Sequence, residues 1–161
     1  MQVCIAKDGV IYKNKLKDSF PLLLLIPLRL GIEGVNPIYF DFIKDCLKLP
    51  FCMGIVGGKP ASSLYFVGFT EEDGENCRLI YLDPHYPQMH ASPLDLETYQ
   101  CDELNLMEIC MLDPSLLLSF AIKSQDELDL LCTLCGSKKW PFSFAATEPN
   151  YDELDALIEM E

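Results

Sequence analysis

The chain has 161 residues, of which half are apolar and fewer than a quarter are charged, a balance typical of globular proteins. Its formal net charge of −13 argues against a phosphate-binding surface, because nucleic-acid-binding proteins depend on clustered Lys and Arg. The composition therefore predicts one folded domain that binds no nucleic acid.

The eight cysteines and the apolar segments indicate a reducing compartment rather than secretion or a membrane. The first twenty residues contain no apolar run of signal-peptide length, which disfavours a disulfide scaffold. The longest apolar stretch, residues 21–28, contains two prolines and is far too short to cross a bilayer. We expect a cytoplasmic protein without a transmembrane segment.

The first elements in chain order are two predicted strands and a helix. Residues 1–12 have the composition of a strand. Residues 22–26 are aliphatic without alternation, as in a central strand that is buried on both faces. Asn36 followed by Pro37 predicts a helix start, because Asn caps the free amides and Pro loses no hydrogen bond there. Pro50 predicts the end of that helix.

The middle of the chain predicts three short strands joined by turns. Residues 55–56 read as a strand that runs into a glycine-rich turn over residues 57–60. Residues 64–69 are rich in aromatic side chains and predict the next strand. The acidic residues 71–75 predict a turn, and residues 79–82 predict another strand.

The last part of the chain is predicted to form a strand, a helix and an edge strand. Residues 117–122 are strand-like, and residues 124–127 form a capping box for a helix that Gly136 is expected to end. Residues 141–145 suit an edge strand. The layout predicts a mixed α/β fold with a central sheet flanked by helices over residues 1–147.

Asp83 and His85 are the residues whose spacing suggests chemistry. In a strand, residues two apart point to the same side, and Pro84 between them stiffens the backbone. A carboxylate beside an imidazole fixes its tautomer and stabilises its cation, which a thiol or hydroxyl nucleophile needs from its base. An ordinary turn after a strand explains the same residues.

Four motifs in chain order resemble the autophagin family of cysteine proteases. They are PLLLLIPLRLG from residue 21, GIVGGKP from residue 54, YFVGF from residue 65 and LIYLDPH from residue 79. The resemblance continues more weakly through residues 111–124 and so covers nearly all of the chain. It implies a papain-like fold and an enzyme that cleaves ubiquitin-like autophagy modifiers of the GABARAP type after their C-terminal glycine. It also implies later release of the lipidated modifier from phosphatidylethanolamine on membranes.

The same resemblance implies roles for two groups of residues and no cofactor. The Asp-Pro-His motif of the family maps onto Asp83 and His85, as catalytic acid and histidine. The loop that covers the substrate cleft and lifts when substrate enters maps onto five consecutive residues. These are Gly58, Lys59, Pro60, Ala61 and Ser62.

The sequence departs from the family at the nucleophile. In autophagins the cysteine lies upstream in a Trp-Gly-Cys-type motif, whereas the single tryptophan here, Trp140, precedes a proline. Without a thiolate, the Asp-His pair has nothing to activate. Two hypotheses stay open: the chain is the C-terminal part of a cysteine endopeptidase, or it is a catalytically incomplete module that binds the modifier without cutting it.

The remaining cysteines are interpreted as core residues. Cys46 is predicted on the buried face of a helix and Cys52 precedes the glycine turn, and free cysteine is among the most buried residue types. Cys132 and Cys135 form a CxxC, but they lack the second pair that a structural zinc site needs. Cys4 has no visible base nearby in the sequence.

Residues 148–161 form an acidic tail with two alternative interpretations. Tyr151 and Leu154 enclose two acids, which resembles the short motif that autophagy modifiers bind by adding a strand to their sheet. Asn150 equally suits the cap of a helix, with Glu153 completing a capping box.

Overall fold

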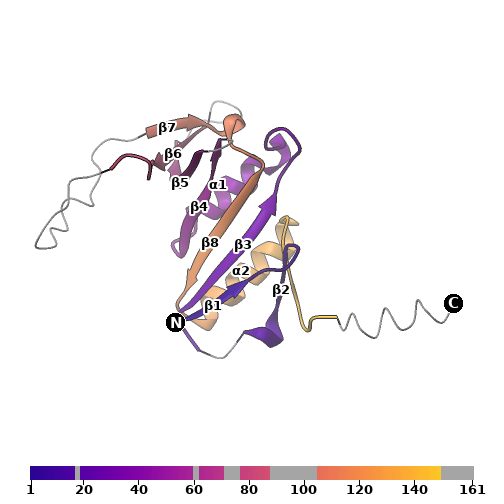
Figure 1. Cartoon of the computed structure of the whole chain (residues 1–161). Helices are drawn as coiled ribbons and strands as arrows, with labels where there is room; N and C mark the ends of the chain where they lie inside the picture. Colours follow the sequence, from indigo (N-terminus) through magenta and orange to yellow (C-terminus); the bar gives the residue numbers. More distant parts are fainter. Residues whose placement is uncertain (17–18, 60–61, 71–76, 88–104, 150–161) are drawn as a thin grey trace, which may run out of the picture.

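The structure is a computed structural model, and it describes residues 1–16, 19–59, 62–70, 77–87 and 105–149. Its elements, in chain order, are β1 (Gln2–Ile5), β2 (Val10–Tyr12), η1 (Lys13–Lys15), β3 (Leu22–Arg29), η2 (Pro37–Tyr39), α1 (Phe40–Lys48), β4 (Cys52–Lys59), β5 (Ser62–Phe69), β6 (Arg78–Leu82), β7 (Asn105–Glu108), η5 (Ile109–Met111), β8 (Ser115–Ile122), α2 (Gln125–Lys138) and β9 (Ser143–Ala145). The predicted mixed α/β class is confirmed (Figure 1).

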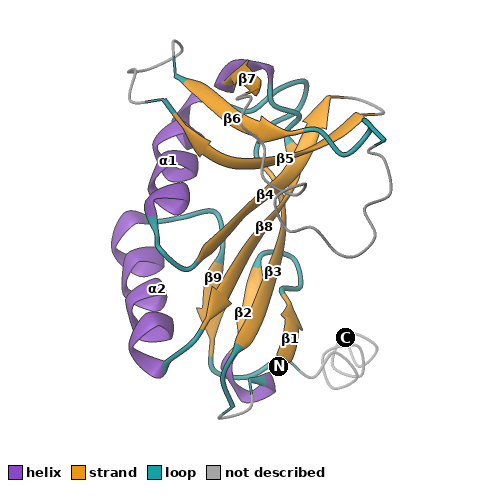
Figure 2. Cartoon of the chain, turned by 90° about the vertical axis from the view of Figure 1, so that its left-hand side faces the viewer, coloured by secondary structure: helices purple, strands orange, loops and turns teal. Residues whose placement is uncertain are grey.

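Within the described residues, one seven-stranded sheet has the order β1-β3-β8-β4-β5-β6-β7, and β2 pairs with β9 in a separate two-stranded sheet. In the large sheet, β1 runs parallel to β3 and the other neighbouring strands are antiparallel. Register shifts interrupt β4 between Cys52 and Gly54, and β5 between Phe66 and Gly68. Such bulges bend strands and increase their twist. Figure 2 shows β5 and β6 turned away from the direction of β3.

The core lies on one face of this sheet, between the strands and both helices (Figure 2). α1 contacts β4 and β5, whereas α2 contacts β8 and β9. Paired residues of neighbouring strands supply the buried side chains, such as Leu24 opposite Phe120 and Ile55 opposite Phe66. The sheet therefore buries alternate residues of each strand beneath the helices.

Both predicted helix starts are confirmed, with small differences in geometry. The Asn36 side chain accepts a hydrogen bond from the Ile38 amide at 3.1 Å, but the first turn is the 3₁₀ segment η2, which leads into α1. The Ser124 hydroxyl accepts from the Glu127 amide at 3.3 Å. The Glu127 carboxylate accepts from the Lys123 amide at 2.6 Å, one residue before the donor that a capping box uses.

The expected helix end at Gly136 is wrong. α2 continues to Lys138 and is closed by Lys139, whose φ of 51° is left-handed. Trp140 then donates its amide to the Cys135 carbonyl at 3.2 Å, and its ring packs edge-on against Phe42 with centroids 5.4 Å apart. The tertiary contact of the tryptophan, rather than the glycine, sets where the helix stops.

Two strand boundaries also differ from those expected. The predicted single strand over residues 1–12 is two strands, because Asp8 and Gly9 adopt positive φ values of 50° and 73° between them. The predicted turn over residues 57–60 is wrong in its first three positions, since β4 continues to Lys59 and Gly57 pairs with Leu64 of β5.

β3 lies inside the sheet as predicted, between β1 and β8, but it is not fully buried on both faces. Leu22, Leu24 and Ile26 are buried beneath the helices. Leu23 and Leu25, which point to the other face, are only half-buried. The aliphatic run of β3 therefore has apolar side chains on both faces of the sheet, although the described residues bury only one of these faces fully.

The start of the acidic tail is attached to the body of the protein. Glu148 forms ion pairs with Lys7 at 2.5 Å and with Lys15 at 3.1 Å. These two lysines lower the pKa of the Glu148 carboxyl, Lys7 more than Lys15. In the part of the chain that the structure describes, we find no helix with the length and hydropathy of a membrane span.

Candidate active site

Asp83 and His85 lie directly after β6 and contact each other. The Asp83 Oδ1 atom is 2.7 Å from the His85 ring Nδ1 and also accepts the His85 backbone amide at 2.9 Å. The pair forms through a turn after the strand, which is the alternative that the sequence offered to a continued strand. The His85 side chain is 53% exposed and that of Asp83 is 21% exposed, so the pair is open to water.

The electrostatics of this pair keep the carboxyl ionised. The pKa of Asp83 is lowered, first by the hydrogen bond from the His85 amide and then by the bond from its ring. An ionised carboxylate accepts a hydrogen bond from Nδ1–H, and this leaves Nε2 of the ring as the atom that can take a proton from a neighbour. The arrangement can orient a general base towards a nucleophile.

The same turn occurs a second time in the chain, without a histidine. Asp113 accepts the Ser115 amide at 2.8 Å across Pro114, as Asp83 accepts the His85 amide across Pro84. The turn is thus a property of the Asp-Pro-x sequence itself. The imidazole contact is the feature that distinguishes the first turn from the second.

Three of the five residues of the predicted cleft-covering loop lie in the described strands, where β4 ends and β5 begins. Gly58 and Lys59 end β4, and Ser62 begins β5. Pro60 and Ala61 lie outside the described residues. The assignment of this loop to the substrate cleft stays a prediction.

This hairpin tip and Asp83 lie at the same end of the sheet. Leu82, the residue before Asp83, pairs with Tyr65 of β5, three residues after the first residue of that strand, Ser62. Strand register therefore brings together two segments that the sequence separates by twenty residues. The loop is in a position to flank the Asp83–His85 pair.

Gly58 has both a conformational and an anchoring role in this tip. Its φ of +151° is one that side chains rarely adopt, and an added Cβ would lie 2.3 Å from the Ser62 carbonyl oxygen. The Gly58 carbonyl accepts the Asp113 amide at 2.7 Å. Sequence reasoning missed this contact, although the Asp-Pro-Ser run of residues 113–115 was the available signal.

Burial raises the pKa of five of the described cysteine thiols, whereas a nucleophilic cysteine needs a lowered pKa. Desolvation is the largest cause in each, and it raises the pKa of Cys135 to about 11. The other four are Cys4, Cys46, Cys52 and Cys132. Burial therefore disfavours the thiolate form at these five positions.

Two further described thiols also have surroundings unlike those of a nucleophile. The Cys77 sulfur is buried and lies 3.6 Å from the Thr70 carbonyl oxygen. The Cys110 sulfur lies 3.7 Å from a Glu108 carboxylate oxygen, and a carboxylate disfavours a thiolate. Within the described residues, the hydrogen-bond partner of the His85 ring is Asp83, not a cysteine.

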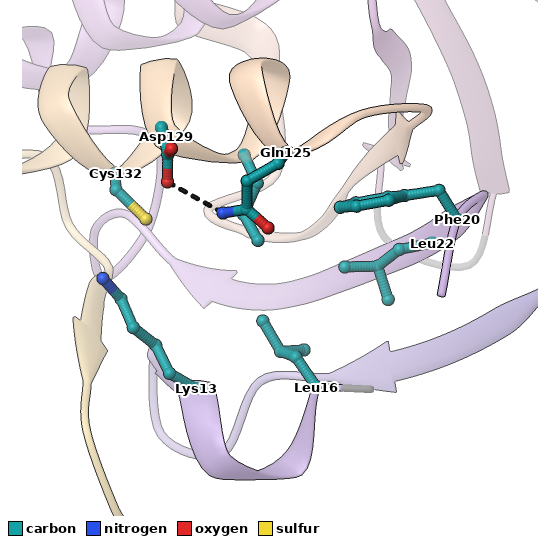
Figure 3. A pocket seen from close by; sticks show the side chains of 8 residues that line it. Lys13, Leu16, Phe20, Leu22, Gln125, Asp129 and Cys132 are labelled. Carbon is teal, nitrogen blue, oxygen red and sulfur yellow. Dashed lines mark hydrogen bonds between the residues drawn. The ribbon is translucent and has the colours of Figure 1, made fainter. Parts of the chain in front are cut away.

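Of the two cysteines of the CxxC in α2, Cys135 is buried as predicted, whereas Cys132 is only half-buried. The Cys135 thiol donates to the Phe142 carbonyl at 2.6 Å, and the Cys132 and Lys13 side chains point towards each other at one side of a cavity of about 150 Å³ (Figure 3). In the described ranges, no three His, Cys, Asp or Glu side chains gather as a metal site. The docking motif proposed for Tyr151 and Leu154 lies outside the described residues.

Comparison with known proteins gives one family. The chain matches the peptidase C54 catalytic domain over residues 1–134. It is 36% identical over 156 residues to the probable cysteine protease ATG4 of Meyerozyma guilliermondii, which covers 96% of this chain and 37% of the relative. It is 42% identical over 120 residues to cysteine protease ATG4A of Gallus gallus, covering 71% of this chain and 30% of the relative.

A third relative, cysteine protease atg4da of Danio rerio, is 35% identical over 145 residues, covering 83% of this chain and 29% of the relative. The chain thus spans about a third of the length of the curated relatives it matches.

Proposed function

The chain belongs to the peptidase C54 family of cysteine proteases and has its papain-like fold, and from this premise we propose that it supplies the base and acid of a cysteine endopeptidase of autophagy. The proposed substrates are the C-termini of ubiquitin-like autophagy modifiers, free or conjugated to phosphatidylethanolamine, in the cytoplasm. The observation that carries the proposal is the 2.7 Å contact between Asp83 and His85, at the open end of β6.

In this mechanism, His85 first acts as a general base. Its Nε2 takes the proton of a cysteine thiol, and Asp83 stabilises the resulting imidazolium. The thiolate attacks the carbonyl carbon of the modifier's C-terminal glycine. His85 then gives the proton to the leaving amine, either of a peptide or of phosphatidylethanolamine. Water hydrolyses the remaining thioester and restores the thiol.

The thiol in this proposal comes from outside the described residues. Two observations support this: burial raises the pKa of five described thiols, and the described hydrogen-bond partner of the His85 ring is Asp83 rather than a cysteine. In this proposal, residues 1–147 form the C-terminal part of the peptidase domain and residues 148–161 form a tail that binds the modifier.

A chimera tests the role of His85. In it, this chain replaces the matching segment of the Meyerozyma guilliermondii relative, and the substrate is a modifier with a C-terminal extension. The chimera should release the extension, and His85→Ala should lower kcat/KM by roughly 10²–10⁴-fold, as loss of general acid–base catalysis does. Binding of the modifier should change little.

The matched control is Tyr86→Ala, which removes the neighbouring, 77% exposed side chain and should leave kcat/KM within about twofold. Turnover that survives His85→Ala would remove this histidine from the mechanism.

A second candidate function is a module that binds the modifier without cutting it, and the raised pKa values of the described thiols favour it. The purified 161-residue chain should then bind the modifier but release no extension, with or without iodoacetamide. Release that iodoacetamide blocks would show a nucleophile within this chain and reject the module.

A further inference from the structure

A cavity of about 320 Å³ lies between the start of α1 and the end of α2, and it is larger than the cavity of about 150 Å³ in Figure 3. Residues of η2 and α1 line one side, and residues 138–141 line the other. Its volume falls within the range of roughly 300–1,000 Å³ that is usual for ligand sites. Neither Asp83 nor His85 is among its described lining residues, so the proposed mechanism gives this cavity no role.

The buried lining residues, which form the floor of the cavity, are aromatic. The Phe42 and Trp140 rings meet edge-on with centroids 5.4 Å apart, and they are 6% and 8% exposed. Ile38 also lines the cavity, but it is 73% exposed and therefore lies at the mouth. An apolar group that enters the cavity would cover Ile38 and pack on the aromatic floor, which removes apolar surface from water.

The charged side chains that line the mouth leave one positive charge without a partner. Asp41 of α1 pairs with Lys44 at 2.7 Å, and Asp45 of α1 pairs with Lys138 of α2 at 2.6 Å. Both carboxylates of the lining are therefore already neutralised. Lys139 is exposed and lines the same cavity, and among the described residues no carboxylate forms an ion pair with it.

The surroundings of the cavity are basic, although the whole chain has a net charge of −13. Lys44 lowers the pKa of the Asp41 carboxyl most, and Lys48 and Lys138 lower it further, so these three lysines lie around this carboxyl. Lys139 adds a fourth positive charge at the cavity. A local positive patch on an otherwise acidic protein selects an acidic partner for this site.

Lys139 has a backbone conformation that lysine rarely adopts. Its φ of 51° and ψ of 50° are left-handed, and helices that end in this way usually have Gly or Asn at the position. The chain therefore ends α2 with a cation beside the cavity in spite of the backbone strain. Strained residues of this kind gather at ligand sites.

We propose that this cavity binds an acidic peptide of a partner protein, with one large apolar side chain on the aromatic floor and a neighbouring carboxylate on Lys139. The buried rings supply a rigid surface for the apolar side chain, and the lysines around Asp41 set the sign of the partner's charge. One apolar anchor and one ion pair predict weak binding, with a Kd of roughly 0.01–1 mM.

Tryptophan fluorescence tests the proposal, because Trp140 is the single tryptophan of the chain and lines the cavity. The probe is the capped pentapeptide Asp-Glu-Phe-Asp-Glu, titrated into the 161-residue chain. We expect a saturable change that weakens as salt is added. Two control peptides should not bind: Asp-Glu-Ala-Asp-Glu lacks the apolar anchor, and Lys-Lys-Phe-Lys-Lys has the opposite charge.

Three variants of the full chain locate the binding. Lys139→Gly removes the charge and suits the left-handed backbone, so the variant keeps the fold, and it should weaken binding by about threefold to fivefold. Ile38→Ala should weaken binding by about fivefold, since it removes apolar surface at the mouth. The matched control is Lys123→Ala, which removes the same charge at the other end of α2 and should change the Kd by less than about twofold.

Several outcomes would overturn the proposal. They are equal affinity of the wild type and Lys139→Gly, equal binding of the lysine peptide, and no saturable binding of the acidic peptide at millimolar concentration by fluorescence or by NMR shifts of the amides that line the cavity. Tighter binding by the full chain with Tyr151→Ala and Leu154→Ala would instead assign the cavity to the acidic tail. A dimer in sedimentation velocity that Ile38→Ala dissociates would assign it to a second copy. None of these measurements uses cleavage, so the proposal stands or falls independently of the proposed function.

Discussion

The two faces of the large sheet are built from the same strands and from similar residue types, yet they have different surroundings. Beneath α1 and α2, Leu24, Ile55 and Phe66 are at most 1% exposed. On the opposite face of the sheet, which we call the open face, Val56 and Ile5 are 41% and 61% exposed. The strands are apolar on both sides, but among the described residues only one side has helices packed on it (Figure 2).

An unbroken run of aliphatic residues in a strand is typical of a sheet that is covered on both faces. A sheet with one face in water alternates apolar and polar residues, whereas a sheet with two covered faces has no need to. β3 reads Leu-Leu-Leu-Leu-Ile at its start, yet Leu23 and Leu25 remain half-buried. The composition of the strand thus matches a protein in which the second face is also covered.

The largest expected effect comes from the same substitution made on either face of β3. Leu24→Ala removes a fully buried side chain opposite Phe120 and should lower the free energy of unfolding by about 2–5 kcal/mol. Leu23→Ala should lower it by well under half as much, because its half-buried site leaves no enclosed cavity. Urea denaturation of both variants measures the difference.

Equal losses for the two variants would mean that both faces are covered in the isolated chain, and the comparison would fail.

A smaller effect on the free energy of unfolding is expected for α2, one of the two helices that cover the core face of the sheet. Ser124→Ala removes the hydroxyl that caps α2 and should lower the free energy of unfolding by about 1 kcal/mol. The thermal midpoint and hydrogen exchange of the β8 amides beneath α2 measure this loss. Ser137→Ala is the control, since its hydroxyl donates only to the Leu134 carbonyl near the exposed end of the helix. A similar loss in both variants would contradict the capping role of Ser124.

Local signals in the sequence predicted the elements well where short-range chemistry decides them. Asn36 and Ser124 begin helices because their side chains accept amides only two or three residues away. Lys59 could not be assigned to β4 in this way, because its strand conformation depends on pairing with Ser62 of β5. The end of α2 depends in turn on where Trp140 packs, which is a contact with α1.

The contact between Asp83 and His85 was predictable from their spacing, but the arrangement around it was not. The spacing suited either a continued strand or a turn after it, and the structure forms the contact through an Asp-Pro turn. The proximity of the hairpin tip to Asp83 depends on the register between β5 and β6, which no local pattern encodes. The sequence also did not show that the sheet is fully buried on one face only, because β3 has leucine side chains on both faces.

The smallest expected effect lies where the open face ends, at Asp83, and it is a change in pKa rather than in stability. The pKa of Asp83 is lowered, and the hydrogen bond from the His85 amide contributes more than the bond from the ring. His85→Ala keeps the amide and removes the ring, so the pKa should rise only part of the way to the ordinary value of about 3.9. Carbon-13 NMR of the Asp83 carboxyl across the acid range measures it.

The control for this titration is Asp41, whose pKa is lowered by Lys44 and should not respond to His85→Ala. Because the folded pKa of Asp83 lies below its unfolded value, the contact stabilises the fold fully above about pH 4 and is lost as the pH falls through the folded pKa. The Asp83 carboxyl is therefore ionised at neutral pH, where the proposed base must act. An Asp83 pKa that stays unchanged in His85→Ala would mean that the ring does not bind the carboxylate in solution. The carboxylate would then not orient the imidazole of the proposed base.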